Sequence, residues 1–391
     1  MWKRLPALLL KIQLMCLGVE FSTTLELTKI NIVDNHSPFQ RGAGGIKTMT
    51  KKSKVLLIYT GGTIGMMEDA KSGHLIPFDF KQLKEQIPEL NKFNVDLSSI
   101  SFENPLDSSN MQPEIWVKIA KLIEKKYSKV DGFVILHGSD TMSFTASALS
   151  FMLENLNKPV ILTGSQLPIG TIRTDGKENL ITAIEIAAAK EKGKSIISEV
   201  CIYFESQLYR GNRTHKFNSE HFKAFHSANY PILAEAGVTI KYKFNALKKA
   251  STQKLKIHTS LNPNIAILKL FPGITQNIVE AILNAKGIKA VILETFGSGN
   301  ASTQKWFINA IKTTIDKGIV ILNVTQCNAG AVEQGKYATS ASLAKMGVIG
   351  GADITTEAAV AKLMFVLGST NNKKEIEKLL KSDLRGEMTD N

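Results

Sequence analysis

The sequence predicts an α/β protein with a larger N-terminal domain, built on a mainly parallel sheet, and a smaller C-terminal α/β domain. From residue 55 onward, short apolar runs alternate with segments of helical periodicity, as in strands linked by helices. Most runs are continuous and rich in valine and isoleucine, which is typical of parallel strands covered on both faces. A basic stretch with few strand signals, residues 241–256, separates two such blocks and predicts a domain boundary.

The apolar runs and the periodic segments give the expected elements in order. The expected strands are Val55–Tyr59, Phe133–Leu136, Val160–Thr163, Val200–Phe204, Ile265–Phe271, Ala290–Glu294 and Ile319–Val324. The expected helices are Pro113–Tyr127, Thr141–Leu156, Gly176–Lys190, Gln276–Ala285, Thr303–Lys317 and Glu357–Leu367. Pro113 supports the first helix start, because the first turn of a helix tolerates proline.

The domain prediction places an N-terminal domain at 52–245, a linker at 246–261 and a C-terminal domain at 262–391. Residues 1–50 are interpreted as a leader, a linker or a mis-annotated extension. Their first 22 residues resemble a weak signal peptide, but Lys11 interrupts the apolar region and no clear cleavage site follows. The apolar region is too short to span a bilayer. A true start at Met49 and a secretory leader both remain open.

Charge and cysteine usage narrow the class of protein. Among 391 residues, 48 are Lys or Arg and 35 are Asp or Glu, so the formal net charge is +13. Much of the excess gathers in the first 54 residues and in 241–256, and we interpret it as solvated charge rather than a nucleic-acid or membrane surface. The three cysteines lie far apart, so neither a zinc ribbon nor a disulfide framework is expected, and a reducing compartment fits best.

Two glycine-containing segments follow expected strands and carry hydroxyl groups. The first is Thr60-Gly-Gly-Thr63-Ile-Gly, and the second is His137-Gly-Ser139-Asp140-Thr. In open parallel sheets, ligands bind beyond the carboxyl ends of the strands. Each segment alone has an ordinary explanation as a turn or a helix cap, but the pair together predicts a site at this edge of the sheet.

Common catalytic motifs are missing from the sequence. It contains no P-loop, no Gly-x-Gly-x-x-Gly opening a helix, no Gly-x-Ser-x-Gly elbow and no histidines at metal-ligand spacing. His137 is interpreted as a loop or supporting residue rather than a general base. A hydroxyl nucleophile still needs a base, and a lysine can serve. Lys216, beside Arg213 in a segment that follows an expected strand, is a candidate, although a solvated basic loop would look alike.

The ordered set of motifs resembles the L-asparaginase family, most closely its cytoplasmic type I branch. The two glycine-containing segments look like its two signature motifs, and further matching stretches are Asp107–Met111, Ala146–Leu156, Tyr209–Lys216, Phe296–Asn300, Thr325–Cys327 and Leu384–Thr389. The resemblance implies hydrolysis of L-asparagine to L-aspartate and ammonia without metal or organic cofactor. It also implies a cytoplasmic homodimer or homotetramer, with no nucleic-acid or membrane partner; export is the alternative if residues 1–22 act as a signal peptide.

The resemblance also implies roles for individual residues. Thr63 would attack the side-chain amide and form an aspartyl ester. A relay would activate that hydroxyl or the water of the second half-reaction; its members are Ser139, Asp140 and Lys216. The substrate's amino-acid head group would be held by Asp107, Ser108, Ser109, Ser139 and Asp140.

Three positions depart from the family pattern. Ser139 stands where the family has threonine, and the loop after the first motif lacks the tyrosine that many members carry, leaving His74 or Tyr337 as candidates to replace it. Glu294 stands where bacterial type I enzymes with an allosteric asparagine site have arginine, which disfavours cooperative activation.

Two rival functions are an asparaginase-like subunit of a glutamyl-tRNA amidotransferase and a non-catalytic amino-acid sensor.

Overall fold

The computed structural model describes residues 52–68, 75–77, 87–335 and 338–389. The predicted leader or extension at 1–50, and the two candidate lid residues His74 and Tyr337, lie outside the described residues.

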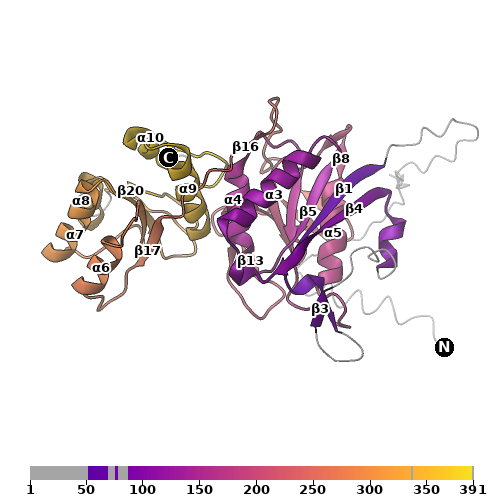
Figure 1. Ribbon diagram of the computed structural model, residues 1–391, viewed down its shortest axis with the longest axis horizontal. Helices are drawn as coiled ribbons and strands as arrows, with labels where there is room; N and C mark the ends of the chain where they lie inside the picture. Colours follow the sequence, from indigo (N-terminus) through magenta and orange to yellow (C-terminus); the bar gives the residue numbers. More distant parts are fainter. Residues whose placement is uncertain (1–51, 69–74, 78–86, 336–337, 390–391) are drawn as a thin grey trace, which may run out of the picture. The chain divides into compact units, whose positions relative to one another are not determined.

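An eight-stranded sheet forms the centre of the N-terminal domain (Figure 1). Its strands, in spatial order, are β15 (Ile240–Tyr242), β14 (Ala234–Ala236), β11 (Gln207–Arg210), β10 (Val200–Phe204), β7 (Val160–Thr163), β5 (Gly132–Leu136), β1 (Ser53–Gly61) and β4 (Val95–Leu106). The five strands from β10 to β4 pair in parallel, and β11, β14 and β15 add antiparallel strands beside β10. The sheet is therefore mainly parallel, as the apolar runs predict.

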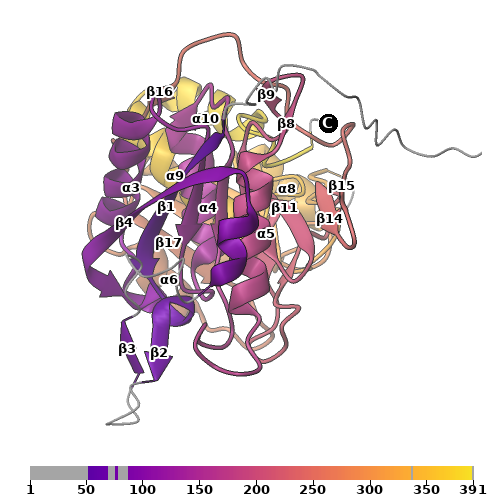
Figure 2. The same cartoon turned by 90° about the vertical axis from the view of Figure 1, so that its right-hand side faces the viewer.

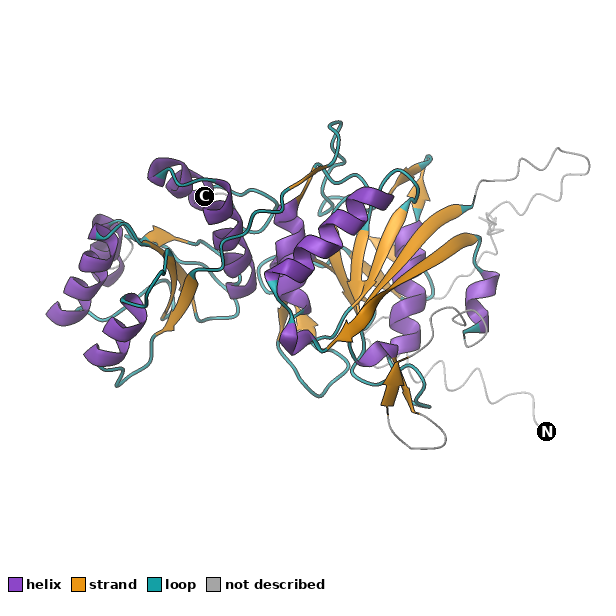
Figure 3. Ribbon diagram, viewed as in Figure 1, coloured by secondary structure: helices purple, strands orange, loops and turns teal. Residues whose placement is uncertain are grey.

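Helices cover both faces of this sheet, which explains why its central strands are apolar throughout (Figure 3). Alternate residues of β1 enter two separate cores. Leu56 and Ile58 pack with α3 (Pro113–Lys126) and α4 (Met142–Met152), whereas Val55 and Leu57 pack with α5 (Gly176–Ala188). The turned view shows α3 and α5 on either side of the sheet (Figure 2). Because apolar cores cover both faces of the sheet, polar functional groups are expected at the ends of its strands.

The C-terminal domain holds a four-stranded parallel sheet. Its strands are β17 (Ile265–Lys269), β18 (Ala290–Thr295), β19 (Val320–Thr325) and β20 (Ile349–Gly350). The helices of this domain are α6 (Gln276–Leu283), α7 (Lys305–Asp316), α8 (Ala338–Met346), α9 (Thr356–Ser369) and α10 (Lys373–Lys381).

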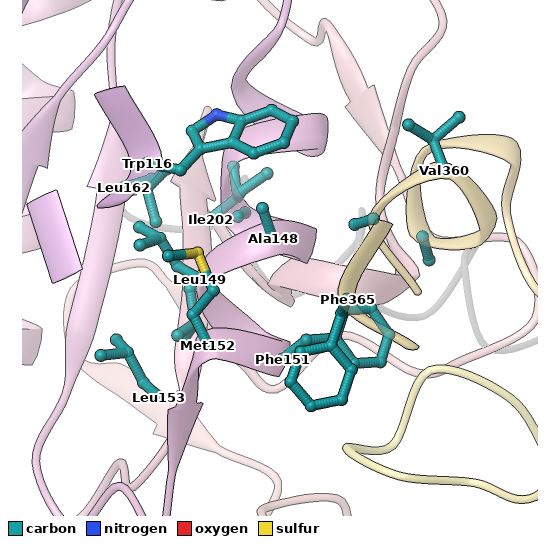
Figure 4. Close-up of a cluster of buried hydrophobic side chains, with 14 of the residues drawn as sticks. Trp116, Ala148, Leu149, Phe151, Met152, Leu153, Leu162, Ile202, Val360 and Phe365 are labelled. Carbon is teal, nitrogen blue, oxygen red and sulfur yellow. The ribbon is translucent and has the colours of Figure 1, made fainter. Parts of the chain in front are cut away.

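Helices α4 and α9 pack against each other and join the two domains through apolar side chains (Figure 4). The rings of Phe151 and Phe365 stack with centroids 5.8 Å apart, and both are buried. α4 begins directly after the segment His137–Thr141, and α9 belongs to the C-terminal domain. The contact between the two helices therefore connects the helix that follows this segment to the C-terminal domain.

Shorter elements complete the described structure. The remaining strands are β2 (Met66–Glu68), β3 (Leu75–Pro77), β6 (Leu153–Glu154), β8 (Lys190–Glu191), β9 (Lys194–Ser195), β12 (His215–Lys216), β13 (Phe225–His226) and β16 (Lys256–Ile257). Single 3₁₀ turns are η1 (Thr63–Gly65), η3 (Pro88–Lys92), η4 (Ser108–Asn110) and η5 (Gly211–Arg213).

The predicted fold class is confirmed, and each of the seven strands and six helices expected from the sequence is present. The helix predicted over 141–156 is too long. It ends at Met152, because Leu153 and Glu154 form β6 and pair with β16. An apolar run looks the same to sequence analysis whether it continues a helix or turns into a short strand.

Candidate active site

The loops that follow β1, β4 and β5 lie together at the carboxyl edge of the larger sheet. Gly61, the last residue of β1, and Gly62, directly after it, have φ values of 136° and 90°, which residues with a side chain rarely adopt. A Cβ atom added at Gly62 would lie 2.4 Å from the backbone nitrogen of Gly138, so these two backbones touch. A Cβ atom at Gly138 would lie 2.5 Å from the hydroxyl of Ser108. The glycines therefore permit the close approach of three loops.

This approach brings the predicted residues into one neighbourhood. Thr63 follows Gly62 and opens η1, and Ser139 follows Gly138. The hydroxyl of Thr141 donates a hydrogen bond of 2.7 Å to the carbonyl of Ser108, which ties the second signature motif to the loop after β4.

Lys216 lies between Ser139 and Asp140 and is bonded to both. Its Nζ donates to Ser139 Oγ at 2.8 Å and to Asp140 Oδ1 at 2.5 Å. The lysine side chain is only 13% exposed, whereas the side chain of Asp140 is 66% exposed. A hydroxyl, a carboxylate and an amine thus form one cluster, with the carboxylate open to an incoming ligand.

Gln166 is a member of this cluster that the sequence analysis missed. Ser139 Oγ donates to Gln166 Oε1 at 3.3 Å, and Gln166 Nε2 donates to the carbonyl of His221 at 3.0 Å. Asp175 fixes the loop by accepting hydrogen bonds from the backbone N–H groups of Gln166 and Leu167. The signal was available, because Gly164-Ser-Gln166 follows β7 just as the signature motifs follow β1 and β5.

Asp107 shapes the loop after β4. It caps η4 by accepting hydrogen bonds at Oδ1 from the backbone N–H of Ser109, at 2.9 Å, and from its hydroxyl, at 2.8 Å. These bonds to the ionised form lower the pKa of the exposed Asp107 carboxyl. Ser108, between the two, is buried.

His137 is fully buried, and both of its ring nitrogens have partners. Nδ1 donates to the carbonyl of Gly138 at 2.7 Å, and Nε2 accepts from the hydroxyl of Thr145 at 2.9 Å. That hydroxyl in turn accepts from Trp116. Burial lowers the pKa of His137 to about 4, despite the hydrogen bond to Gly138. The interpretation of His137 as a supporting residue agrees with this arrangement.

Asp140 and Lys216 open onto a cavity of about 570 Å³ lined by both domains. The C-terminal domain contributes Glu294 and Glu357 to its wall. Glu357 accepts a hydrogen bond of 2.5 Å from His215 and thereby raises the pKa of that histidine. Thr63, although it lies within the described part of the chain, is not among the lining residues.

The described residues contain no group of three or more His, Cys, Asp or Glu side chains arranged to hold a metal ion. No helix within the same residues is long and apolar enough to cross a membrane.

The chain is similar to known proteins over most of its length. Residues 54–248 match the family model described as "Asparaginase, N-terminal", and residues 264–380 match "Glutaminase/Asparaginase C-terminal domain". The chain is 43% identical over 347 residues to L-asparaginase 1 of Escherichia coli (strain K12), covering 87% of this chain and 99% of that protein. It is 39% identical over 372 residues to the 60 kDa lysophospholipase of Mus musculus, covering 88% of this chain and 64% of that protein.

A solved structure agrees with these matches. The crystal structure of L-asparaginase I from Vibrio cholerae O1 biovar eltor str. N16961 superposes with a TM-score of 0.79 at 38% identity, covering 86% of this chain and 99% of that chain. The fold and both domain matches thus lead to the same family.

Proposed function

The chain belongs to the asparaginase family, and from that premise we propose that it hydrolyses L-asparagine to L-aspartate and ammonia with Thr63 as the nucleophile. The Oγ of Thr63 attacks the side-chain amide carbon, and ammonia leaves with the nucleophile's proton, so that an aspartyl ester forms. Water then attacks the ester, which releases aspartate and restores the threonine. Dividing the reaction into two displacements replaces one difficult step by two easier ones.

The relay consists of Ser139, Asp140 and Lys216. The observation that carries this assignment is the pair of hydrogen bonds from Lys216 to Ser139 and Asp140. Once it has lost one proton, the Lys216 amine has a lone pair that can accept the proton of the Ser139 hydroxyl, while the ionised Asp140 holds the lysine in place through their hydrogen bond. That base activates the nucleophile in the first displacement or the water in the second.

Substrate binding uses the same edge of the sheet. Asp140 has an exposed carboxylate that suits the α-ammonium group of an amino acid. Ser108 and Ser109 offer hydroxyl groups to its head group, while Asp107 holds their loop by the cap on η4. Backbone N–H groups of the glycine-containing loops stabilise the oxyanion. Holding the substrate by its head group makes the attack effectively unimolecular.

Amidase kinetics with Thr63→Ala and Lys216→Met test these roles. We expect Thr63→Ala to lower kcat by at least about 1,000-fold, because the nucleophile is removed. Lys216→Met keeps the length of the side chain and removes the base, so we expect a loss of at least about 100-fold. Wild-type rates in either variant would refute the corresponding role.

Release of ammonia also separates the rival functions. The purified chain should release ammonia from free asparagine without any added component. An amidotransferase subunit would require tRNA and its partner subunit, and an amino-acid sensor would release none.

We further propose that the protein is a cytoplasmic homodimer or homotetramer. Size-exclusion chromatography with light scattering would measure the oligomeric state.

A further inference from the structure

The last described segment of the chain has no part in the chemistry proposed above, although its motif Leu384–Thr389 matches the family pattern. We call residues Ser382–Thr389 the C-terminal hook. No residue of the described hook lines the cavity that Asp140 and Lys216 share. The hook nevertheless contacts the segment that carries Lys216.

A buried ion pair fixes the shape of the hook. Glu387 and Lys362 are both 0% exposed, and their charged atoms are 2.7 Å apart. Glu387 also accepts hydrogen bonds from the backbone N–H groups of Leu384 and Arg385, so its carboxylate closes a turn. Lys362, on α9, donates to the carbonyl of Ser382 at 2.6 Å. Because breaking such a pair leaves a buried charge alone, the hook has one strongly favoured conformation.

The hook forms hydrogen bonds with Arg213, which is only 3% exposed. Arg213 Nε donates to the carbonyl of Gly386 at 2.7 Å, and its guanidinium also reaches Thr389 Oγ1 at 3.5 Å and Asp353 Oδ2 at 2.8 Å. Thr389 in turn donates to Asp353 from both its backbone N–H and its hydroxyl, each at 2.7 Å. The rigid fork of the guanidinium thus engages three acceptors at once.

Asn212, next to Arg213 in the sequence, also contacts the hook. Asn212 Nδ2 donates to the carbonyl of Arg385 at 3.2 Å. Residues 212 and 213 belong to η5, which leads directly into the two-residue strand that carries Lys216. This strand has two register pairs, His215 with His226 and Lys216 with Phe225, and His215 also bonds Glu357 of the C-terminal domain. On its N-terminal side the strand is supported through η5.

We propose that the C-terminal hook positions Lys216 through Arg213, so that the end of the chain is required for amide hydrolysis although it does not touch the reacting atoms. The proposal rests on the assignment of Lys216 to the relay. Arg213, Asp353 and Glu387 are positioning residues in this scheme. A displacement of about 1 Å at a reacting group can cost about 100-fold in rate, so a loosened η5 has a measurable effect.

Arg213→Lys is the main test, because it keeps the positive charge beside Asp353 and removes the fork that reaches Gly386. We expect kcat to fall by roughly 10- to 100-fold, while KM changes by less than about threefold. Asp353→Asn is the second variant and should give a loss in the same direction; it keeps the test decisive if Arg213→Lys does not fold. Both are compared at equal folded fraction, checked by circular dichroism and melting temperature.

Lys190→Gln is the matched control. The substitution removes another contact between distant segments, the ion pair of 3.0 Å between Lys190 on β8 and Asp131 just before β5, which involves neither η5 nor the hook. We expect its kcat to stay within about twofold of wild type.

The pH profile of kcat/KM distinguishes positioning from simple destabilisation. The titratable groups that line the cavity with Lys216, apart from Arg213 and Asp353, are Asp140, His215, His226, Lys269, Glu294, Cys327 and Glu357. All seven are unchanged in Arg213→Lys, so a changed pH profile reports a rearrangement around the relay rather than a loss of folded protein. A profile and kcat equal to those of Lys190→Gln in both test variants would overturn the proposal. Wild-type kcat in Lys216→Met would instead refute the relay itself.

Discussion

Among single residues, Ser139 is the one on which the polar cluster converges, since its hydroxyl accepts from Lys216 and donates to Gln166. Threonine at this position keeps the hydroxyl and adds a methyl group that restricts χ1. We therefore expect Ser139→Thr to retain kcat within about tenfold, whereas Ser139→Ala loses roughly 100- to 10,000-fold. Steady-state kinetics with asparagine measures both. Abolished activity in Ser139→Thr would count against the assignment.

His137 gives a pH-dependent prediction at the same scale. Its pKa of about 4 in the folded chain lies below the ordinary value of 6.5, so between these pH values the unfolded chain binds the extra proton. The free energy of unfolding contributed by this site is complete above pH 6.5 and declines by roughly 3 kcal/mol as the pH falls to 4. Urea unfolding of wild type and His137→Asn across this range measures it. Equal slopes in the two proteins would contradict the prediction.

The residues that sequence analysis found and missed differ in how they reach the site. Thr63, Ser139 and Asp140 directly follow strands, so the rule that ligands bind at carboxyl ends identifies them. Arg213 acts through partners about 140 and 170 residues away, at Asp353 and Gly386, and only the folded chain brings these together.

Among the structural elements, the loop after β1 depends on a glycine at position 62. An alanine there would meet the backbone of Gly138 and adopt a φ of 90°. We expect Gly62→Ala to lower the free energy of unfolding by roughly 2–5 kcal/mol and kcat by at least about 100-fold, because Thr63 is displaced.

Gly193→Ala is a matched control for this substitution. Gly193 has a φ of 78°, but an added Cβ would have nothing within 4 Å. Gly193→Ala therefore measures the cost of the backbone conformation alone, a loss of about 1 kcal/mol in the free energy of unfolding, and should leave kcat unchanged. Equal losses of melting temperature and kcat in the two variants would show that close packing at Gly62 is unimportant.

The strands differ in how visible they are to sequence analysis, for a physical reason. β5, β7 and β10 are buried on both faces and therefore read as apolar runs. β4 is an edge strand whose residues are largely exposed or half-buried, and its sequence VDLSSISFENPL is too polar to stand out. β11, β14 and β15 are short, and their antiparallel pairing depends on neighbours rather than on an apolar run.

For the whole molecule, the two domains are joined by both apolar and polar contacts. Helices α4 and α9 pack through Phe151 and Phe365 (Figure 4), while the pair of Arg213 and Asp353 joins η5 to the C-terminal domain. Burial disfavours ionisation of Asp353, but hydrogen bonds from Thr389 and Arg213 outweigh it and lower its pKa. The C-terminal domain thus contributes to the site by supporting the lysine that the N-terminal domain carries.

Cooperativity is a property of the assembled molecule, and Glu294 provides its test. This largely buried side chain lines the shared cavity, accepts a hydrogen bond of 2.7 Å from Thr356 and lies 3.5 Å from Lys269. A carboxylate in that position repels the carboxylate of an amino-acid effector. We therefore expect the rate to rise hyperbolically with asparagine concentration, with a Hill coefficient of about 1. Initial rates over a wide concentration range, at fixed enzyme concentration, measure it. A sigmoidal curve that becomes hyperbolic in Cys327→Ser, at a residue lining the same cavity, would contradict the expectation and place an effector beside Glu294.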